Sequence, residues 1–258
     1  MSSQVAKSRD NAVEAILPQI IETIEKAISL NGSAWLGIGT GTTISVFMEK
    51  LKARLKSDLA KNCFAVSTSF QSQQLIISSG MTLAALSQAP NAELDIAIDG
   101  ADEVDSSGSF IIKGGGGAHL LEKIVALSAK LFIVIVDSDK WRKGIPLAIV
   151  PEAYPLVKKE CEKMNFALVL RNGSGKIGPV ISDQGHIVAD LQPPSSSDGV
   201  FCGLMDIERR LSSITGVVEH GLFCKIAHLV VVGSETGFYI LKHAQVQPFI
   251  GVATDCGL

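Results

Sequence analysis

The sequence predicts an α/β fold in which a Rossmann-like, mostly parallel sheet domain is joined to a second, smaller α+β domain. Short apolar runs alternate with amphipathic segments in the first part of the chain, which is typical of parallel strands covered by helices on both faces. The pattern then changes, because three prolines come close together at Pro146, Pro151 and Pro155. We therefore expect a first domain over 1–144, to which 221–258 returns, and a smaller domain over 145–220.

Helices and strands are expected to alternate through the first domain. Apolar residues recur at helical spacing in four segments, 10–30, 43–61, 69–80 and 118–130. Pro18 favours a break or kink in the first helix, and Gly80 closes the third. Strands are expected in the apolar runs at 34–39, 64–69, 81–86, 95–100, 110–115 and 131–140.

The second half of the chain is expected to contain fewer elements. The smaller domain has a helix at 154–164, strands at 166–171 and 186–191, and a loop at 192–199. The apolar segment 229–241 resembles a strand pair that returns to the main sheet.

Composition favours a small-molecule partner. The chain has 258 residues, 47% of them apolar, and a net charge of -3 with no basic block, so neither disorder nor a nucleic-acid-binding surface is indicated. Its five cysteines form no CxxC pair, which favours a reducing compartment over a disulfide framework or a zinc site. With no long apolar run and no secretory signal, we expect a soluble intracellular protein without membrane partners. The cytoplasm is the first expectation, and a plastid is the alternative if a transit segment has been removed.

Five chemically unusual loops each follow an expected strand. In parallel sheets the carboxyl ends of the strands meet at the ligand-binding edge, so we expect these loops to lie together. They are GIGTGTT at 37–43, STS at 67–69, DGADE at 99–103, KGGGG at 113–117 and DSDK at 137–140.

The first loop favours a single phosphate group over a dinucleotide. The third glycine of a GxGxxG motif is replaced by Thr42, and the next strand ends in Ser67, Thr68 and Ser69 where a ribose-binding acid would stand. Glycine amides, a helix N-terminus and the hydroxyls of Thr40, Thr42 and Thr43 suit a phosphate. The alternative is a plain strand-to-helix turn rich in small residues.

Acidic residues and one lysine surround the glycine-rich loop. Asp99 and Asp102 share one turn, Lys113 precedes the glycines, and Glu122 is expected about two turns into a helix that begins near Gly117. Such a group could supply a base, a proton donor and a cation for developing negative charge. Glycines 114–117 would let a polar ligand approach the backbone. Glu103 and Asp105 could equally be solvated turn residues.

The remaining polar residues carry weaker signals. His119 lies in the glycine-helix motif and could face the cleft, whereas the other histidines are scattered without metal-ligand spacing. The cysteines have no activating neighbours. We expect no metal and no organic cofactor.

Four motifs, in order, resemble ribose-5-phosphate isomerase of the A type: GIGTGTT, DIAIDGADEVD, IIKGGGGAHLLEKIVA and IVDSDK. Weaker similarity continues through GPVISDQGHIVADL and ITGVVEHGLF, so the resemblance covers nearly the whole chain. It implies interconversion of ribose 5-phosphate and ribulose 5-phosphate in the pentose phosphate pathway, through an enediol and without cofactors. It also implies a homodimer or homotetramer.

The resemblance assigns roles to individual residues. Glu122 matches the base, Asp99 and Asp102 match acids near the sugar oxygens, and Lys113 matches the cation. The residues expected to bind the phosphate or the sugar are Gly39, Thr40, Gly41, Thr42, Thr43, Gly100, Ala101, Gly114, Gly115, Gly116 and Lys140.

Several positions depart from the family pattern. A lysine of some members falls near Pro18, the arginine before the glutamate is Leu121, and the D-x-S-K segment is Asp137-Ser138-Asp139-Lys140. The PLPVEV segment is shortened to PLAIV at 146–150, and a glycine-asparagine pair becomes Gly185-His186. These departures leave a second hypothesis open, a sugar-phosphate-binding protein that has lost turnover. An oxidoreductase is a distant third hypothesis because the dinucleotide motif is incomplete.

Overall fold

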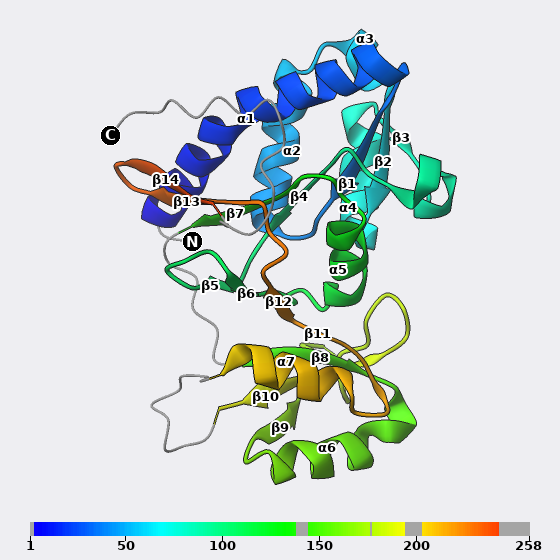
Figure 1. The fold of residues 1–258 in the computed structure, drawn as a ribbon, viewed down its shortest axis with the longest axis vertical. Helices are drawn as coiled ribbons and strands as arrows, with labels where there is room; N and C mark the ends of the chain where they lie inside the picture. The colour runs from blue at the N-terminus through cyan, green and yellow to red at the C-terminus, as the bar shows by residue number, and fades with distance from the viewer. Residues whose placement is uncertain (1–2, 138–143, 176, 194–202, 243–258) are drawn as a thin grey trace.

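The computed structural model describes residues 3–137, 144–175, 177–193 and 203–242. Three sheets run through it (Figure 1): a seven-stranded sheet in the upper part, a four-stranded sheet in the lower part and a three-stranded sheet between them.

The seven-stranded sheet has the order β14-β13-β7-β4-β1-β2-β3. Every neighbouring pair is parallel except β13 with β14, which form an antiparallel hairpin at the edge. Its strands are β1 (Ala34–Ile38), β2 (Cys63–Ser67), β3 (Thr82–Leu83), β4 (Ile96–Gly100), β7 (Phe132–Asp137), β13 (Leu229–Ser234) and β14 (Gly237–Lys242). The α/β class with a mostly parallel sheet is therefore confirmed, and the segment 229–241 does pair with the main sheet. The domain boundaries themselves stay a prediction.

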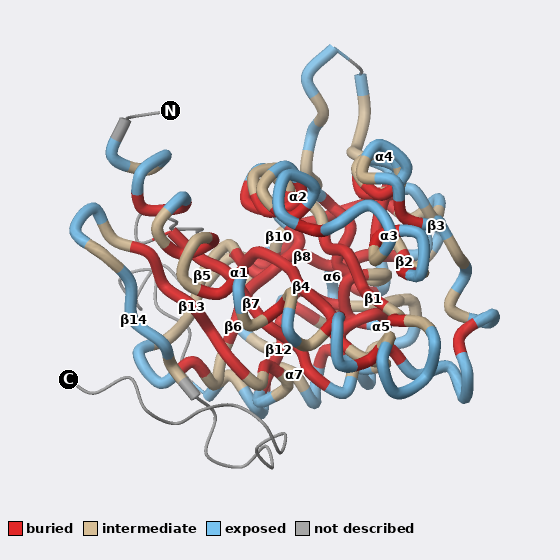
Figure 2. Tube along the Cα trace, turned by 90° about the horizontal axis from the view of Figure 1, so that it is seen from above, coloured by how far each residue is buried: buried red, intermediate tan, exposed pale blue. Residues whose placement is uncertain are grey.

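Helices cover both faces of this sheet, so its central strands are buried on both sides (Figure 2). One face packs against α1, α2 and α4, and the other packs against α5 and β12. The helices of this part are α1 (Ser3–Asn31), α2 (Thr42–Arg54), α3 (Ser57–Ala60), α4 (Phe70–Ser79) and α5 (His119–Leu127). Two short 3-10 helices, η1 (Leu86–Gln88) and η2 (Pro90–Ala92), connect β3 to β4.

Three element predictions need correction. Pro18 does not break α1, which continues from Ser3 to Asn31 because the fully buried side chains of Leu17 and Ile20 hold the helix against the core on both sides of the proline; a kink there stays a prediction. The expected helix 43–61 is two helices, because Leu55 is extended (φ -74°, ψ 123°) and ends α2. The expected strand 81–86 shortens to the two residues of β3.

The four-stranded sheet is antiparallel, with the order β11-β8-β10-β9. It comprises β8 (Ile145–Ile149), β9 (Ala167–Leu170), β10 (Ile187–Gln192) and β11 (Val217–His220), with η3 (Pro151–Ala153), α6 (Tyr154–Lys163) and α7 (Leu204–Ser212). Elements β8, β11 and α7 were not predicted from the sequence. Pro146 obscured β8, yet its carbonyl still accepts a hydrogen bond from Gly221 and its neighbour Leu147 is fully buried.

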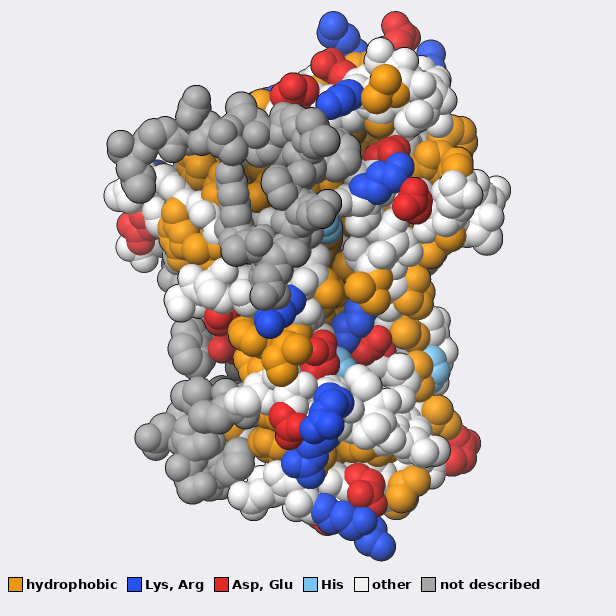
Figure 3. Space-filling view, viewed as in Figure 1, with side chains coloured by type: hydrophobic (Ala, Val, Ile, Leu, Met, Phe, Trp, Pro, Cys, Tyr) orange, Lys and Arg blue, Asp and Glu red, His pale blue; other side chains and the backbone are white. Residues whose placement is uncertain are grey.

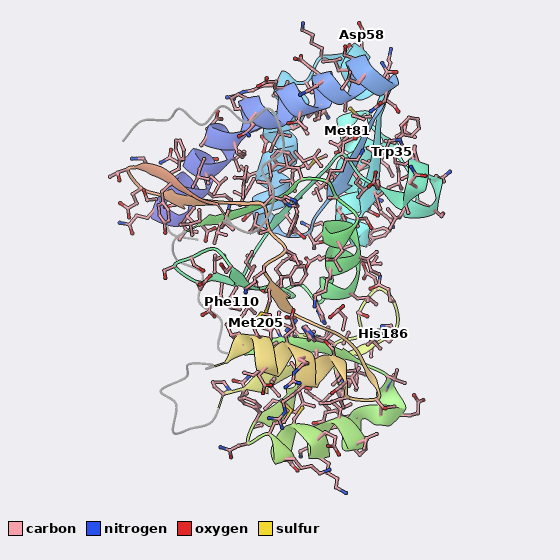
Figure 4. All side chains as sticks on the ribbon, in the orientation of Figure 1. Trp35, Asp58, Met81, Phe110, His186 and Met205 are labelled. Carbon is pink, nitrogen blue, oxygen red and sulfur yellow. The ribbon has the colours of Figure 1, made fainter. Side chains whose placement is uncertain are left out.

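The three-stranded sheet, β12-β6-β5, joins the upper and lower parts. It is antiparallel and comprises β5 (Glu103–Val104), β6 (Phe110–Ile112) and β12 (Leu222–Cys224). The prediction that 110–115 extends the main sheet is therefore wrong. Ile112 and Leu222 pack into the core of the lower sheet, and Phe110 packs against the same core (Figure 4).

Candidate active site

A cavity of about 160 Å³ lies where β4, the start of α2, the end of β6 and the start of α5 meet. Its wall is formed by Thr40, Gly41, Thr42, Thr43, Gly100, Ala101, Asp102, Lys113, Gly114, Gly115, Gly116 and Glu122. All twelve are residues that the sequence predicted for the site. Although β6 belongs to a separate sheet, the turn that follows it still brings Lys113 and the glycines to the carboxyl end of β4.

Lys113 is at the centre of the charged group. Its Nζ lies 2.9 Å from Asp99 Oδ2 and 3.3 Å from Glu122 Oε2, and it donates a 2.6 Å hydrogen bond to the Gly100 carbonyl. The side chain is 2% exposed. Burial lowers the pKa of Lys113, but the charges of Asp99 and Glu122 outweigh burial and leave that pKa above its usual range. A cation is therefore fixed beside the cavity.

Asp99 is the inner carboxylate and does not itself line the cavity. Its Oδ1 accepts hydrogen bonds from the amides of Gly100, at 2.7 Å, and Thr40, at 3.2 Å. Gly39 allows this packing, because a Cβ at that position would lie 2.0 Å from Asp99 Cγ. Gly39 is thus a close-approach residue outside the cavity wall. Burial raises the pKa of Asp99 against the opposing effect of Lys113.

Asp102 is the outer carboxylate, on the turn after β4. Its Oδ2 accepts a 2.6 Å hydrogen bond from the Gly115 amide. This bond joins the acidic turn to the glycine-rich loop, so the four-glycine segment is anchored from one side. Gly114 has φ of +98° and would place a Cβ 2.8 Å from the ring of His119, which explains why glycine stands there.

Glu122 lies in the first turn of α5, because that helix begins at His119. The prediction of a position two turns into the helix was therefore wrong by about one turn. Glu122 is 4% exposed, and among the described residues its Oε2 makes no hydrogen bond beyond the ion-pair contact with Lys113. Burial, reinforced by the charges of Asp99 and Asp102 and opposed by Lys113, raises the pKa of Glu122 to about 8.

Lys113 can neutralise one of its two carboxylate neighbours but not both. Asp99 also accepts two amide hydrogen bonds, which favour its charged form, whereas Glu122 has no such donor within the described residues. At neutral pH we therefore assign the proton to Glu122 and the negative charge to Asp99. Glu122 is poised to exchange a proton with a molecule in the cavity.

In the loop before α2, two groups that we expected to face a phosphate are bonded to other residues of the protein. The Gly41 amide is already bonded to Gln71 Oε1 at 2.9 Å, and the Thr40 hydroxyl bonds to Thr68 and Ser69, both at 2.7 Å. These groups shape the loop. The first two residues of α2, Thr42 and Thr43, line the cavity at the helix N-terminus, where the helix dipole favours an anion.

Lys140 and the rest of segment 138–143 lie outside the described residues, as do residues 194–199 of the predicted loop and 243–258. His119 does not face the cleft. It is fully buried behind Gly114, and burial lowers its pKa to about 3.

Thr68 and Ser69 of the expected STS loop do lie at the site, where they bond to the Thr40 hydroxyl. Three further residues were not predicted: Gln71 bonds to the Gly41 amide, Phe223 has its ring centroid 5.6 Å from Lys113 Nζ, and Arg171 contacts the glycine loop. Nothing in the local sequence distinguishes Arg171 or Phe223.

A second cavity lies elsewhere on the molecule. It has a volume of about 280 Å³ and lies far from the charged group, between α1 and the start of β7, where it is lined by residues such as Gln19, Lys26 and Lys130. On the face seen in Figure 3, basic side chains lie beside acidic ones.

Within the described ranges, no three His, Cys, Asp or Glu side chains are grouped to hold a metal ion. None of the described helices has the length and apolar character needed to cross a membrane.

Comparison with known proteins identifies relatives. The family model described as ribose 5-phosphate isomerase A (phosphoriboisomerase A) matches residues 64–237. Ribose-5-phosphate isomerase of Dictyostelium discoideum is 42% identical over 212 residues, covering 78% of this chain and 87% of that protein. Ribose-5-phosphate isomerase A of Methanothermobacter thermautotrophicus is 41% identical, covering 80% of this chain and 89% of that protein.

Solved structures agree with these sequences. Ribose 5-phosphate isomerase A of Methanocaldococcus jannaschii superposes with a TM-score of 0.72 at 34% identity, covering 86% of this chain and 97% of that one. A D-ribose-5-phosphate isomerase in complex with phospho-erythronic acid gives a TM-score of 0.74 at 33% identity, covering 87% and 98%.

Proposed function

This chain belongs to the ribose 5-phosphate isomerase A family, and from that premise we propose that Glu122 is the base that moves a proton between C1 and C2 of the sugar. The protein is an aldose-ketose isomerase that interconverts D-ribose 5-phosphate and D-ribulose 5-phosphate. One observation carries the assignment of the base: a buried carboxyl with pKa raised to about 8 lines the cavity and lies 3.3 Å from a fixed cation.

The reaction needs one proton acceptor and a way to hold negative charge on oxygen. Ionised Glu122 removes the proton from C2, the electron pair forms the C1–C2 double bond, and the oxygen at C1 takes up a proton from solvent to give the enediol. Glu122 then delivers its proton to C1, and the hydroxyl at C2 becomes the new carbonyl by releasing its own proton to solvent, which balances the proton taken up at the C1 oxygen. No redox partner is consumed in this sequence.

Lys113 supplies the positive charge that stabilises the developing oxyanion. Its Nζ is held by Asp99 and the Gly100 carbonyl, so it needs no reorganisation during the reaction. Asp102 lines the same cavity, where its side-chain oxygens can accept a hydrogen bond from a sugar hydroxyl. These roles follow from position and charge.

We place the phosphate at the N-terminus of α2, against Thr42 and Thr43. The family resemblance adds Lys140 to this end of the site. Inorganic phosphate or sulfate should then compete with substrate, and unphosphorylated ribose should turn over poorly, because the phosphate contributes binding energy that orients the reacting carbons. A kcat/KM for ribose similar to that for its phosphate would contradict this placement.

The related isomerase that binds phospho-erythronic acid supports an enediol route for this chain. A phosphorylated sugar acid presents two oxygens on one carbon, which imitates the charge distribution of an enediolate beside a phosphate group. We expect such compounds to inhibit this protein more strongly than inorganic phosphate does.

The decisive measurement is whether hydrogen from solvent enters C1 of the product. Purified protein with EDTA and ribose 5-phosphate in D₂O should place deuterium at C1 of ribulose 5-phosphate, because the proton held by Glu122 exchanges with solvent during the enediol's lifetime. A sugar-phosphate-binding protein without turnover would be stabilised against heat by ribose 5-phosphate and yet produce neither ketose nor label. That result would replace the proposed mechanism.

Assembly and location are part of the same proposal. We expect a homodimer or homotetramer, to be measured by analytical ultracentrifugation, since that is what the family resemblance implies. The described cysteines Cys63, Cys161 and Cys224 are buried free thiols, which fits a reducing compartment such as the cytoplasm or a plastid. Fractionation of the source cells would separate these two locations.

A further inference from the structure

Arg171 extends from the end of β9 in the lower sheet to the glycine-rich loop of the active site. Its NH1 donates hydrogen bonds to the carbonyls of Gly114 and Gly115, at 2.9 and 3.1 Å. Its other nitrogens pair with Asp190 of β10, with Nε 2.9 Å from Oδ2 and NH2 2.5 Å from Oδ1. Both charged side chains are 15% exposed.

The pairing with Asp190 fixes the plane of the guanidinium group. A two-point contact between arginine and a carboxylate leaves little freedom for the third nitrogen, which here is the one that meets the loop. The backbone of Arg171 is fixed as well, because its amide donates to the Val188 carbonyl and its carbonyl accepts from the Val180 amide. The group that contacts the glycines is therefore preorganised by the lower sheet.

The contact acts on a peptide unit that also reaches the catalytic group. The carbonyl of Gly114 bonds to Arg171, and the amide of the same peptide, on Gly115, bonds to Asp102 Oδ2 at 2.6 Å. In a trans peptide the C=O and N–H groups point in opposite directions. Holding the carbonyl on one side therefore aims the amide at Asp102 on the other.

Charge reinforces this geometry. A cation at the carbonyl polarises the peptide and makes its N–H a stronger donor to the carboxylate. The Gly115 carbonyl is held too, so the next amide, on Gly116, points away from Arg171. Glycine backbones have the greatest conformational freedom of any residue, so this loop depends on such external contacts for its orientation.

We propose that Arg171, held by Asp190, is a positioning residue that orients Asp102 through the Gly114–Gly115 peptide. This inference rests on the proposed role of Asp102 in the isomerase reaction. It gives the lower sheet a function in turnover: its β9 and β10 supply the outer support of the glycine loop.

The test compares Arg171→Met, Arg171→Lys and a control, Arg209→Met. Arg209 is also in an arginine-aspartate pair, with Asp206, but its side chain is 80% exposed on α7. For Arg171→Met we expect kcat to fall roughly 10- to 100-fold, because small displacements of catalytic groups are costly. The inhibition constant of inorganic phosphate should change less than about 3-fold, since the α2 end of the site is untouched. Arg171→Lys keeps the charge without the fork and should recover part of the loss, and Arg209→Met should behave as the parent protein.

A double-mutant cycle with Asp102→Asn identifies the path of the effect. If Arg171 acts through Asp102, Arg171→Met should cost less than about 3-fold in kcat when Asp102 is already asparagine. Equal losses in both backgrounds, or an Arg171→Met protein with parental kcat well below its melting temperature, would overturn the inference while leaving the isomerase function intact. An unmodified chain without any turnover would overturn the proposed function and this inference together.

Discussion

Two buried lysines, Lys113 and Lys123, lie over the ring of Phe223, and their pKa values are shifted in opposite directions. Lys113 Nζ is 5.6 Å from the ring centroid and Lys123 Nζ is 5.0 Å from it. Lys113 faces two carboxylates, which raise its pKa above the usual range despite burial. Lys123 contacts Glu219 at 2.6 Å and the neutral ring of His220 at 3.1 Å, and burial lowers its pKa.

The number of carboxylate neighbours decides this difference, since both lysines are buried. The second carboxylate beside Lys113 is Glu122, which cannot also be ionised cheaply and so holds an exchangeable proton. Among the described residues, Lys123 has one carboxylate at ion-pair distance, Glu219, and two further acceptors on His220. These contacts satisfy its ammonium group without a second carboxylate that must hold a proton. Lys113 belongs to the charged group that we propose as the active site, and Lys123 links α5 to β11.

The largest expected effect comes from removing the proton carrier on the Lys113 side. Glu122→Gln should lower kcat on the order of 10²-fold or more with little change in substrate affinity, because an amide of the same shape cannot accept a proton from carbon. Steady-state kinetics and deuterium incorporation at C1 measure it. The matched control is Glu162→Gln on α6, an exposed carboxylate, which should keep parental rates. A Glu122→Gln protein with near-normal turnover would remove Glu122 from the role of base.

The next effect distinguishes the two lysines directly. Lys113→Met should reduce kcat by about 10²-fold, the usual cost of losing one preorganised group that stabilises an oxyanion. Lys123→Met should leave kcat within a few-fold and instead lower the free energy of unfolding by about 1–3 kcal/mol, because Glu219 and His220 lose their shared partner. Denaturant titration and initial rates on both proteins, with exposed Lys163→Met as the control, separate these outcomes. Similar kcat losses in both variants would mean that the lysines are not functionally distinct.

Rates should depend on pH through the same carboxyl group. Because the pKa of Glu122 is raised to about 8, mainly by burial, the ionised base is scarce below that pH. We expect kcat/KM to rise about tenfold per pH unit below this value and then to level off. A profile that is flat between pH 6 and 8 would contradict an ionised Glu122 as the base.

The smallest effects are the opposite pH dependences of stability on the two sides of Phe223. The folded state holds a proton on Glu122 that the unfolded chain releases above its ordinary pKa of 4.5, so this group's contribution to stability declines as pH rises from 4.5 to about 8. Burial, then Lys123, lowers the pKa of His220 to about 3, so the unfolded state gains its proton first and stability declines as pH falls below 6.5. Melting temperatures from pH 4.5 to 8.5 should show both slopes. Glu122→Gln should flatten the upper one, and His220→Gln should reduce the lower one, to which His119 also contributes.

The sequence was informative wherever a function needed a local motif. Asp99, Asp102, Lys113 and Glu122 stand in short runs with glycine, and this local pattern is sufficient to predict them as site residues. The apolar strands of the parallel sheet were equally clear. Strand β8 was missed because Pro146 signals a turn locally, while its burial between β10 and β11 depends on distant segments.

The supporting residues were missed for a related reason. Arg171, Phe223 and Gln71 are single side chains far along the chain from the groups that they contact, and no spacing rule predicts such long-range contacts. Nothing in the sequence indicated that the Gly41 amide, which we expected to face a phosphate, donates to Gln71 Oε1. Sequence patterns predicted the residues that form the cavity wall, and tertiary packing determined their orientation.

Gly221 contacts the backbone of Lys113, so the pocket cannot form during synthesis until residue 221 has been made. Its amide donates to the Pro146 carbonyl and its own carbonyl accepts from the amide of Lys113, and a Cβ there would lie 2.2 Å from the Lys113 carbonyl oxygen. The backbone of the central lysine is thus completed by a segment made much later in translation. A nascent chain that has not yet released this segment from the ribosome should already contain the β1–β4 sheet and yet be catalytically silent. Recovery of turnover during refolding should accordingly lag behind recovery of helix and strand signals.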